Sequence, residues 1–390
     1  MKTNFPLVFL LWGAGLGAAA QYAKVSVVFD SLPELYPEAG AALGLAVSLV
    51  GAVGLVLGVV AGILVARAGF RRTLLLALWG GAVLSSLQAL VPPFAAFLAL
   101  RLLEGVSHLA LVVALPTFIA QLSVPAHRGL TLTLWGTFFG VAFALVAALG
   151  QPLVARYGVP ALFLAHAAYM ASFALVLSRV LKPLGQAVPE ALPGFGALMA
   201  QHVAIYCSPN LSAPAFGWLF YTFCFVAVLT VLPPYLPEAA RFWVMAAMPL
   251  LSIFSSMTLG VALLRFMPAV RVTILGFLLA VLTMVWLWAV PAAPLACLAL
   301  ALALGLIQGS GFASVPELNQ SADAQAQANG AMAQMGNLGN TLGTPVMVAA
   351  LAWAGYAALP LLIGAMLLAG AGVHLWLAYR RARHSFSSDR

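Results

Sequence analysis

Long, uninterrupted runs of apolar side chains are the feature of this sequence that most restricts its fold. Such runs recur along the whole 390-residue chain, for example at 41–66 and 270–290. A helix that crosses the hydrocarbon core of a membrane takes roughly 20 apolar residues. The runs are continuous and do not alternate with polar residues, as the strands of a membrane barrel do. The sequence therefore predicts an all-α membrane protein.

The composition excludes the main classes of soluble protein. Hydrophobic residues make up 64% of the chain and charged residues 7%, whereas soluble domains carry about 25% charged residues. A soluble enzyme, a nucleic-acid-binding protein and a disordered chain are all incompatible with these values. The three cysteines, Cys207, Cys224 and Cys297, are far apart and form no disulfide framework or metal-binding spacing.

Polar breaks between the apolar runs predict twelve transmembrane helices. Residues 182–213 form the longest polar-leaning stretch and contain several prolines, so we expect a cytoplasmic linker there, with a short helix near 195–206 along the membrane surface. The predicted parts are an N-terminal six-helix bundle (1–181), the linker (182–213), a C-terminal six-helix bundle (214–379) and a cytoplasmic tail (380–390). The predicted spans are 5–29, 41–66, 73–91, 94–115, 129–154, 159–181, 214–236, 240–266, 270–290, 293–315, 326–351 and 357–379.

The basic residues predict the orientation of the chain. With the N-terminus in the cytoplasm, thirteen Lys and Arg residues fall in the inner loops and tails and two in the outer loops. Positive charge favours the cytoplasmic side. We therefore expect a multi-pass protein of the inner (plasma) membrane with both termini in the cytoplasm, and an uncleaved first helix.

Three short motifs of the first half recur in the second half at offsets of 198 to 204 residues. Each recurs at an equivalent place within its predicted span, which indicates a duplicated unit and two pseudo-symmetric six-helix bundles. The pairs are Gly62-x4-Arg67 with Gly260-x4-Arg265, Glu104-Gly105 with Gln308-Gly309, and Gly129 with Gly330.

Two of these motifs also carry a resemblance to a known family. The loop between the second and third spans is glycine-rich and basic, and the fourth span contains Arg101-Leu-Leu-Glu104-Gly105, close to Arg-x-x-Gln-Gly. With His127-Arg128-Gly129 before the fifth span, the chain resembles the major facilitator superfamily over almost its whole length. The residues of the loop that match the family's signature are Gly62, Arg67, Gly69, Arg71 and Arg72.

The resemblance implies secondary transport by alternating access, with a small-molecule substrate bound midway between the halves and the basic loop involved in gating. Two departures bear on function. Ala66 stands where the family usually has an acidic residue that helps to latch the halves together. Glu104 stands where the family more often has Gln, which adds a titratable group.

The fourth span carries the most informative polar residues. Arg101, Glu104 and His108 lie at i, i+3 and i+7, which places them on one helix face. Charged residues at membrane depth are costly, so one interpretation is that Glu104 exchanges protons and Arg101 pairs with it or binds an anionic substrate. The alternative is that Arg101 and Glu104 form a structural pair near the outer surface, with His108 packed beside them.

Other spans contribute weaker candidates. Lys24 lies near the outer end of the first span, where its side chain either extends to the membrane surface or points inward and adds a second positive charge opposite Arg101. His166 in the sixth span is more typical of a buried structural histidine. The remaining substrate- or proton-binding candidates are Gln21, Tyr221, Gln308, Gln334, Asn337 and Asn340.

No nucleotide-binding or hydrolytic motif is present in the sequence. We therefore expect no enzymatic activity, no cofactor, no metal and no nucleic-acid partner, and an ion gradient as the source of energy. The predicted function is transport of a small organic solute by a monomer in the lipid bilayer, coupled to protons. Uptake of an organic anion and export of a drug-like compound both remain open. The alternative is a non-transporting membrane receptor or assembly factor with the same fold.

Overall fold

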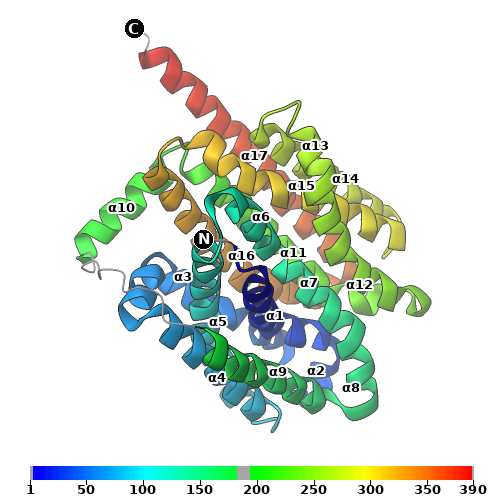
Figure 1. The fold of residues 1–390 in the computed structure, drawn as a ribbon. Coiled ribbons are helices and arrows are strands. Elements are labelled where there is room, and N and C mark those ends of the chain that lie inside the picture. Colours follow the sequence, from blue (N-terminus) through cyan, green and yellow to red (C-terminus); the bar gives the residue numbers. More distant parts are fainter. Residues whose placement is uncertain (1–2, 182–193, 389–390) are drawn as a thin grey trace. The chain divides into compact units, whose positions relative to one another are not determined.

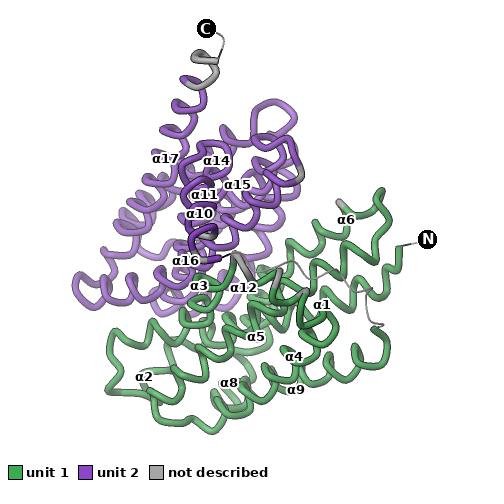
Figure 2. Tube along the Cα trace, turned by 90° about the vertical axis from the view of Figure 1, so that its left-hand side faces the viewer, with its two compact units in different colours: residues 1–192 green, residues 193–390 purple. Residues whose placement is uncertain are grey.

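The computed structural model describes residues 3–181 and 194–388. Helices account for nearly all of these residues. The chain divides into two compact units, residues 1–192 and 193–390 (Figures 1 and 2). The boundary falls within the predicted linker.

The first unit is built from long helices joined by short connections. A π-helical turn, Val146–Gly150, separates α7 from α8, so that α6 to α8 form one interrupted rod over the predicted fifth span. The helices are α1 (Phe5–Val27), α2 (Leu32–Leu35), α3 (Leu43–Ala68), α4 (Phe70–Gln88), α5 (Phe94–Gln121), α6 (Pro125–Gly136), α7 (Phe138–Leu145), α8 (Gln151–Tyr157) and α9 (Val159–Val180).

The second unit has a similar plan, and its first helix coincides with the short helix expected in the linker. A second π-helical turn, Ser256–Gly260, follows α12. The helices are α10 (Phe195–Cys207), α11 (Ser212–Val231), α12 (Glu238–Ser255), α13 (Val261–Leu263), α14 (Ala269–Ala289), α15 (Pro294–Leu318), α16 (Ala322–Ala354) and α17 (Ala358–Ser388).

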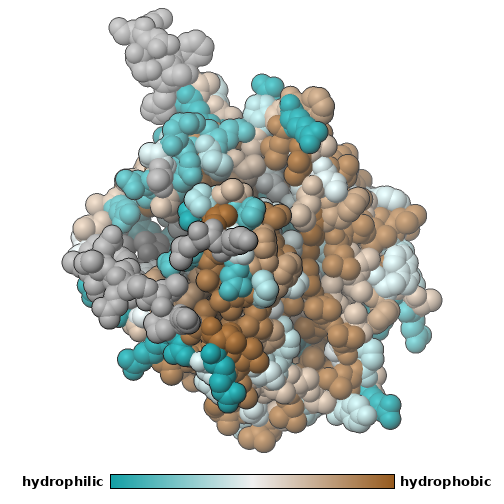
Figure 3. Space-filling model, in the orientation of Figure 1, coloured by the Kyte–Doolittle hydropathy of each residue, from teal (hydrophilic) through white to brown (hydrophobic). Residues whose placement is uncertain are grey.

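Ten helical segments among the described residues are long and apolar enough to cross a membrane. One of them, 323–383, runs over both α16 and α17, and α4 is not among the ten. Figure 3 shows apolar residues over much of the visible surface, and large apolar side chains are fully open to the surroundings, such as Trp353 (90% exposed) and Phe266 (86%). Apolar surface on this scale is typical of lipid-facing helices.

Glycines at positive φ set the direction in which two helices of the first unit begin. Gly69 (φ 86°) precedes α4, and Gly158 (φ 80°) precedes α9. Only glycine adopts this backbone conformation without strain. Both helices can therefore follow the preceding helix after a single-residue connection, which brings α4 and α9 into the same packed bundle as α1 and α5.

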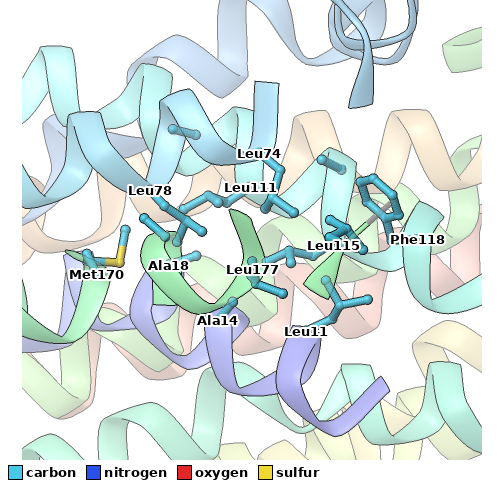
Figure 4. Packing of buried hydrophobic residues seen from close by; sticks show 14 of the residues in the cluster. Leu11, Ala14, Ala18, Leu74, Leu78, Leu111, Leu115, Phe118, Met170 and Leu177 are labelled. Atoms are coloured by element: carbon cyan, nitrogen blue, oxygen red, sulfur yellow. The ribbon is translucent and has the colours of Figure 1, made fainter. Parts of the chain in front are cut away.

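The core of the first unit lies between α1, α4, α5 and α9. Figure 4 shows apolar side chains from all four helices in contact with one another. Along each helix these side chains recur three, four or seven residues apart, the spacing of one helix face. The labelled residues are Leu11, Ala14, Ala18, Leu74, Leu78, Leu111, Leu115, Phe118, Met170 and Leu177.

Candidate proton- and substrate-binding site

The inward faces of the same four helices become polar beyond the apolar core. Lys24 and Ser85 lie three residues before the ends of α1 and α4, and Arg101 and His166 lie seven residues after the starts of α5 and α9. At a rise of about 1.5 Å per residue, all four lie within about 11 Å of the same end of the bundle. We call this group, with Gln88 and Glu104, the buried polar cluster.

Glu104 is the centre of the buried polar cluster. Its Oε1 is 2.6 Å from Lys24 Nζ, and its Oε2 is paired with Arg101 Nη1. Gln88 Nε2 donates to Oε2 at 2.8 Å. The side chains of Lys24, Arg101 and Glu104 are 0% exposed, so the carboxylate bridges two cations that have no contact with the surroundings.

Further hydrogen bonds fix both cations in place. Arg101 Nε donates to the Ala46 carbonyl of α3 at 2.6 Å. Lys24 Nζ also donates to Ser85 Oγ and lies 5.3 Å from the centre of the Phe163 ring. Of the two positions expected for Lys24, extension to the membrane surface is therefore wrong, because its amine points into the bundle and is completely buried.

His166 belongs to the same cluster, although its sequence context favoured a structural histidine. Its Nε2 is 2.9 Å from the Gly17 carbonyl, which only accepts, so Nε2 carries the proton. In the neutral ring Nδ1 then accepts from Ser85 Oγ at 2.6 Å, and Lys24 Nζ lies 3.4 Å away. The sequence signal that could have identified His166 is its position seven residues after the start of α9. If neighbouring helices are antiparallel, this position lies at the same membrane depth as Lys24 near the end of α1 and Arg101 near the start of α5.

His108 and Gln21 flank the cluster without bonding to its carboxylate. His108 Nδ1 donates to the Ala18 carbonyl at 2.9 Å, and its ring packs edge-on against Tyr22, with 5.1 Å between ring centres. Gln21 Nε2 donates to Ser107 Oγ at 2.9 Å. The i, i+3, i+7 spacing thus brings Arg101 and Glu104 into contact, and His108 bonds to the backbone of α1.

The cluster contains two cations and one carboxylate, so its formal charge is +1 when His166 is neutral. A buried charge without a partner is costly. Several buried polar atoms also have no hydrogen-bond partner. In and beside the cluster these atoms are Arg101 Nη2, the Tyr22 hydroxyl, Gln21 Oε1 and Gln88 Oε1.

The candidates of the second unit do not form a comparable cluster. Gln308 accepts from Ser252 Oγ at 3.5 Å, and Tyr221 stacks between Trp218 and Phe225. Both groups are neutral, and the ring of Tyr221 is buried against other aromatic rings. They line the interior of the unit without concentrating charge there.

The amides of α16 have three different environments. Gln334 Oε1 accepts from the Tyr206 hydroxyl of α10 at 2.7 Å, and burial raises the pKa of Tyr206 to about 12, so this hydroxyl keeps its proton. Asn337 Nδ2 donates to its own helix at the Ala333 carbonyl, 3.0 Å away. Asn340 Oδ1 is buried without a hydrogen-bond partner. Gln334 therefore joins α16 to the linker helix.

The glycines between these amides serve close packing. A Cβ on Gly339 would lie 2.5 Å from the Leu219 carbonyl of α11 and 2.8 Å from the Phe223 amide nitrogen. Gly343 lies equally close to the Phe223 backbone. Small residues let two membrane helices approach in this way.

The basic loop between α3 and α4 is anchored to the end of α9. Arg71 Nε donates to the Leu181 carbonyl at 2.6 Å, and Arg71 Nη2 donates to the Ser178 carbonyl at 2.7 Å. Gly69 supplies the positive φ of the turn, and Arg72 is exposed. Gly62 has open space where a Cβ would be. The two hydrogen bonds of Arg71 therefore hold this segment within the first unit.

One known family matches this chain in sequence, and solved structures match it in fold. The sequence model of the Major Facilitator Superfamily matches residues 11–344. No curated protein matches the sequence. A bacterial homologue of the human lysosomal transporter Spinster, in an inward-facing and occupied conformation, has a TM-score of 0.78 at 14% identity, over 97% of this chain and 97% of that chain.

A second solved structure is the human organic anion transporter MFSD10 (TETRAN). It has a TM-score of 0.71 at 19% identity, over 96% of this chain and 100% of that chain. Identities this low show the shared fold, and the family follows from the sequence match. Because that match covers most of the 390 residues, the chain belongs to the major facilitator superfamily.

Proposed function

We propose that the protein is a proton-coupled secondary transporter that moves a small organic solute across the inner membrane by alternating access. The buried polar cluster is the observation that carries this proposal. Charged side chains inside a membrane helix cost roughly 2.5–3.5 kcal/mol each on insertion scales. A structural pair needs one cation and one carboxylate, whereas Glu104 meets both Lys24 and Arg101.

In this proposal Glu104 is the proton-exchanging group, and Arg101 and Lys24 are its charge partners. Protonation of Glu104 weakens both ion pairs at once, and the pair with Lys24 is the one that joins α1 to α5, so the contact between these two helices is loosened. A proton taken up at this position therefore changes the packing of the N-terminal bundle. Such a link between proton binding and helix packing is what an ion-driven transporter requires.

Two solute classes fit the proposal. The excess positive charge of the cluster favours an organic anion, and one structural neighbour is an organic anion transporter. The aromatic stack of Trp218, Tyr221 and Phe225 favours an apolar, drug-like compound instead. The chain works as a monomer with both termini in the cytoplasm, and the solute is not chemically altered.

A non-transporting receptor or assembly factor is the second candidate. It is favoured by Ala66, which stands where the family usually has the acidic residue of the latch. Such a protein has no need of a proton-exchanging carboxylate. It would bind a partner and show no flux.

Reconstitution into liposomes tests the proposal. A thermal-shift screen of organic anions, cations and neutral drugs at two pH values first identifies the solute, since a ligand of the native state stabilises it by mass action. Uptake of that solute is then measured with and without a pH gradient. We expect Glu104→Gln to abolish the pH dependence and Glu38→Gln, an exposed carboxylate, to leave it intact. Unchanged pH dependence in Glu104→Gln would contradict the role of Glu104.

A further inference from the structure

We propose that the solute is a monoanion whose charged group replaces the Glu104 carboxylate between Lys24 and Arg101, so that one proton is carried with each negative charge. This inference rests on the proposed function, and it chooses between the two solute classes left open there. It follows from the charge count of the buried polar cluster and from its unpartnered donors.

The first step concerns what happens when Glu104 alone takes up a proton. Among the described residues, Glu104 is the only acidic side chain in contact with Lys24 or Arg101. Its protonation would leave two cations, both 0% exposed, without any counter-charge. Stranded buried charges of this kind are strongly unfavourable. Proton uptake at Glu104 therefore needs another negative charge to arrive at the same place.

The second step is the charge balance. Before exchange, Lys24, Arg101 and the Glu104 carboxylate sum to +1. After exchange, Lys24, Arg101, the neutral Glu104 carboxyl group and a monoanion again sum to +1. A neutral solute would leave +2 and a cation +3, whereas a dianion would bring the sum to zero. His166 on α9 stays neutral throughout because a second proton, on its Nδ1, would face the Lys24 ammonium group 3.4 Å away, and His108 on α5, which does not bond to the carboxylate, is counted as neutral before and after the exchange.

The third step concerns the groups that would hold the anion. Arg101 Nη2 and the Tyr22 hydroxyl are buried donors with no partner. When Glu104 is neutral, Arg101 Nη1 and Lys24 Nζ become available as well. Together with Nη2 they offer the forked arrangement that a carboxylate or similar oxyanion binds in a bidentate manner.

The proton on Glu104 also has an acceptor. The Gln88 amide already contacts Oε2 of Glu104 through Nε2, and its Oε1 has no partner. Rotation of this amide lets Oε1 accept from the protonated carboxyl group. Arg101 Nη2 and the Tyr22 hydroxyl thus provide unpartnered donors for the anion, and Gln88 Oε1 provides an unpartnered acceptor for the proton.

Ligand-induced proton uptake by the purified full-length chain tests the inference. The probes are acetate, lactate and benzoate as monoanions, succinate as a dianion, choline as a cation and glucose as a neutral solute. We expect a monoanion to raise Tm and, in lightly buffered detergent solution, to be bound with the uptake of about one proton. Glu38→Gln is the matched control and should take up the same proton.

Glu104→Gln should bind the same monoanion without proton uptake. If that variant does not fold, the double variant Lys24→Gln/Glu104→Gln replaces it, because Arg101 alone then gives the cluster its original charge of +1. The double variant should also bind the anion, more weakly and again without proton uptake. The inference is overturned if only succinate, choline or glucose stabilises the protein, if none of the probes does, or if a monoanion binds without proton uptake.

The failure of this inference is distinguishable from failure of the proposed function. Suppose that a pH gradient drives the uptake of choline or glucose and that Glu104→Gln abolishes this uptake. Proton-coupled transport would then be supported, and the proposal that the solute is a monoanion would be wrong. Monoanion uptake at a rate that does not depend on the pH gradient would contradict the proton coupling itself.

Discussion

The two units place equivalent helices in equivalent contacts, yet among the described residues only those of the first unit form a charged interior. Gly105 in α5 and Gly309 in α15 both follow a polar residue and both pack tightly on a neighbouring helix. A Cβ on Gly105 would lie 2.6 Å from the Val50 carbonyl, and one on Gly309 would lie 2.6 Å from Ser256 Oγ. The preceding residue is Glu104 in the first unit and Gln308 in the second.

The same contrast extends to the neighbouring helices. His166 packs on Gly17 with both ring nitrogens hydrogen-bonded. His374 in α17 packs on Gly217 of α11, and both of its nitrogens are buried and unpartnered. The residue 200 positions after Lys24 is a buried cysteine, Cys224. Helix packing and the chemistry of the interior are therefore separable, and the proposed proton site belongs to one unit.

The largest effect is expected from removal of the bridging carboxylate. Glu104→Ala leaves two buried cations unpaired and should lower the free energy of unfolding by about 3–5 kcal/mol. Gln308→Ala removes a neutral amide with one long hydrogen bond and should cost about 1 kcal/mol. Denaturant titration of both variants in the same detergent measures the difference. Equal losses would show that the charge of the first unit has no special role in stability.

The packing glycines should respond alike in the two units. Gly105→Ala meets a backbone carbonyl, which cannot move aside, and should cost about 1–3 kcal/mol. Gly309→Ala first meets a serine hydroxyl, which can rotate, so its loss should lie at the lower end of that range. Thermal unfolding of the two variants provides the comparison. If Gly309→Ala is clearly the more damaging change, the two helix contacts are not equivalent.

The two histidines should respond in opposite directions. His166→Leu removes hydrogen bonds to Ser85 and Gly17 and should destabilise the protein by about 1–3 kcal/mol. His374→Leu removes two buried nitrogens that have no partner, so its stability should be unchanged or higher. The shift in Tm of each variant tests this. A loss at His374 as large as that at His166 would reveal a partner for the His374 ring.

The apolar runs predicted much more of the fold than of the site. Helix existence follows from local sequence, so most expected spans coincide with helices such as α1, α9 and α14. The contact between Arg101 and Glu104 was also predictable, because it lies within one helix. The contacts of Glu104 with Lys24 and of His166 with Ser85 join residues 80 and 81 positions apart. Only the packing of α1, α4, α5 and α9 places them together, which is why Lys24 and His166 were ambiguous in the sequence.

A small effect on stability is also expected from a substitution that makes the first unit more like the second. Lys24→Met removes one of two cations and leaves Arg101 and Glu104 as a balanced pair, so the buried charge falls from +1 to zero. Replacing a buried cation by an apolar side chain of similar length is often nearly neutral when no charge is stranded. We therefore expect a change of less than about 1 kcal/mol.

For Lys24→Met, two quantities are measured together: the stability, which should change little, and the ligand-induced proton uptake, which should be reduced. With a single cation remaining, protonation of Glu104 no longer strands two charges, and a monoanion has only Arg101 to bind. At a fixed monoanion concentration, ligand-induced proton uptake should fall well below that of the parent protein because less anion is bound, while Tm without ligand stays close to the parent value. Arg156→Gln, an exposed cation of the same unit, is the matched control and should change neither quantity. A large drop in Tm for Lys24→Met would mean that the amine stabilises the bundle as a structural group, and the two units would then differ in packing as well as in charge.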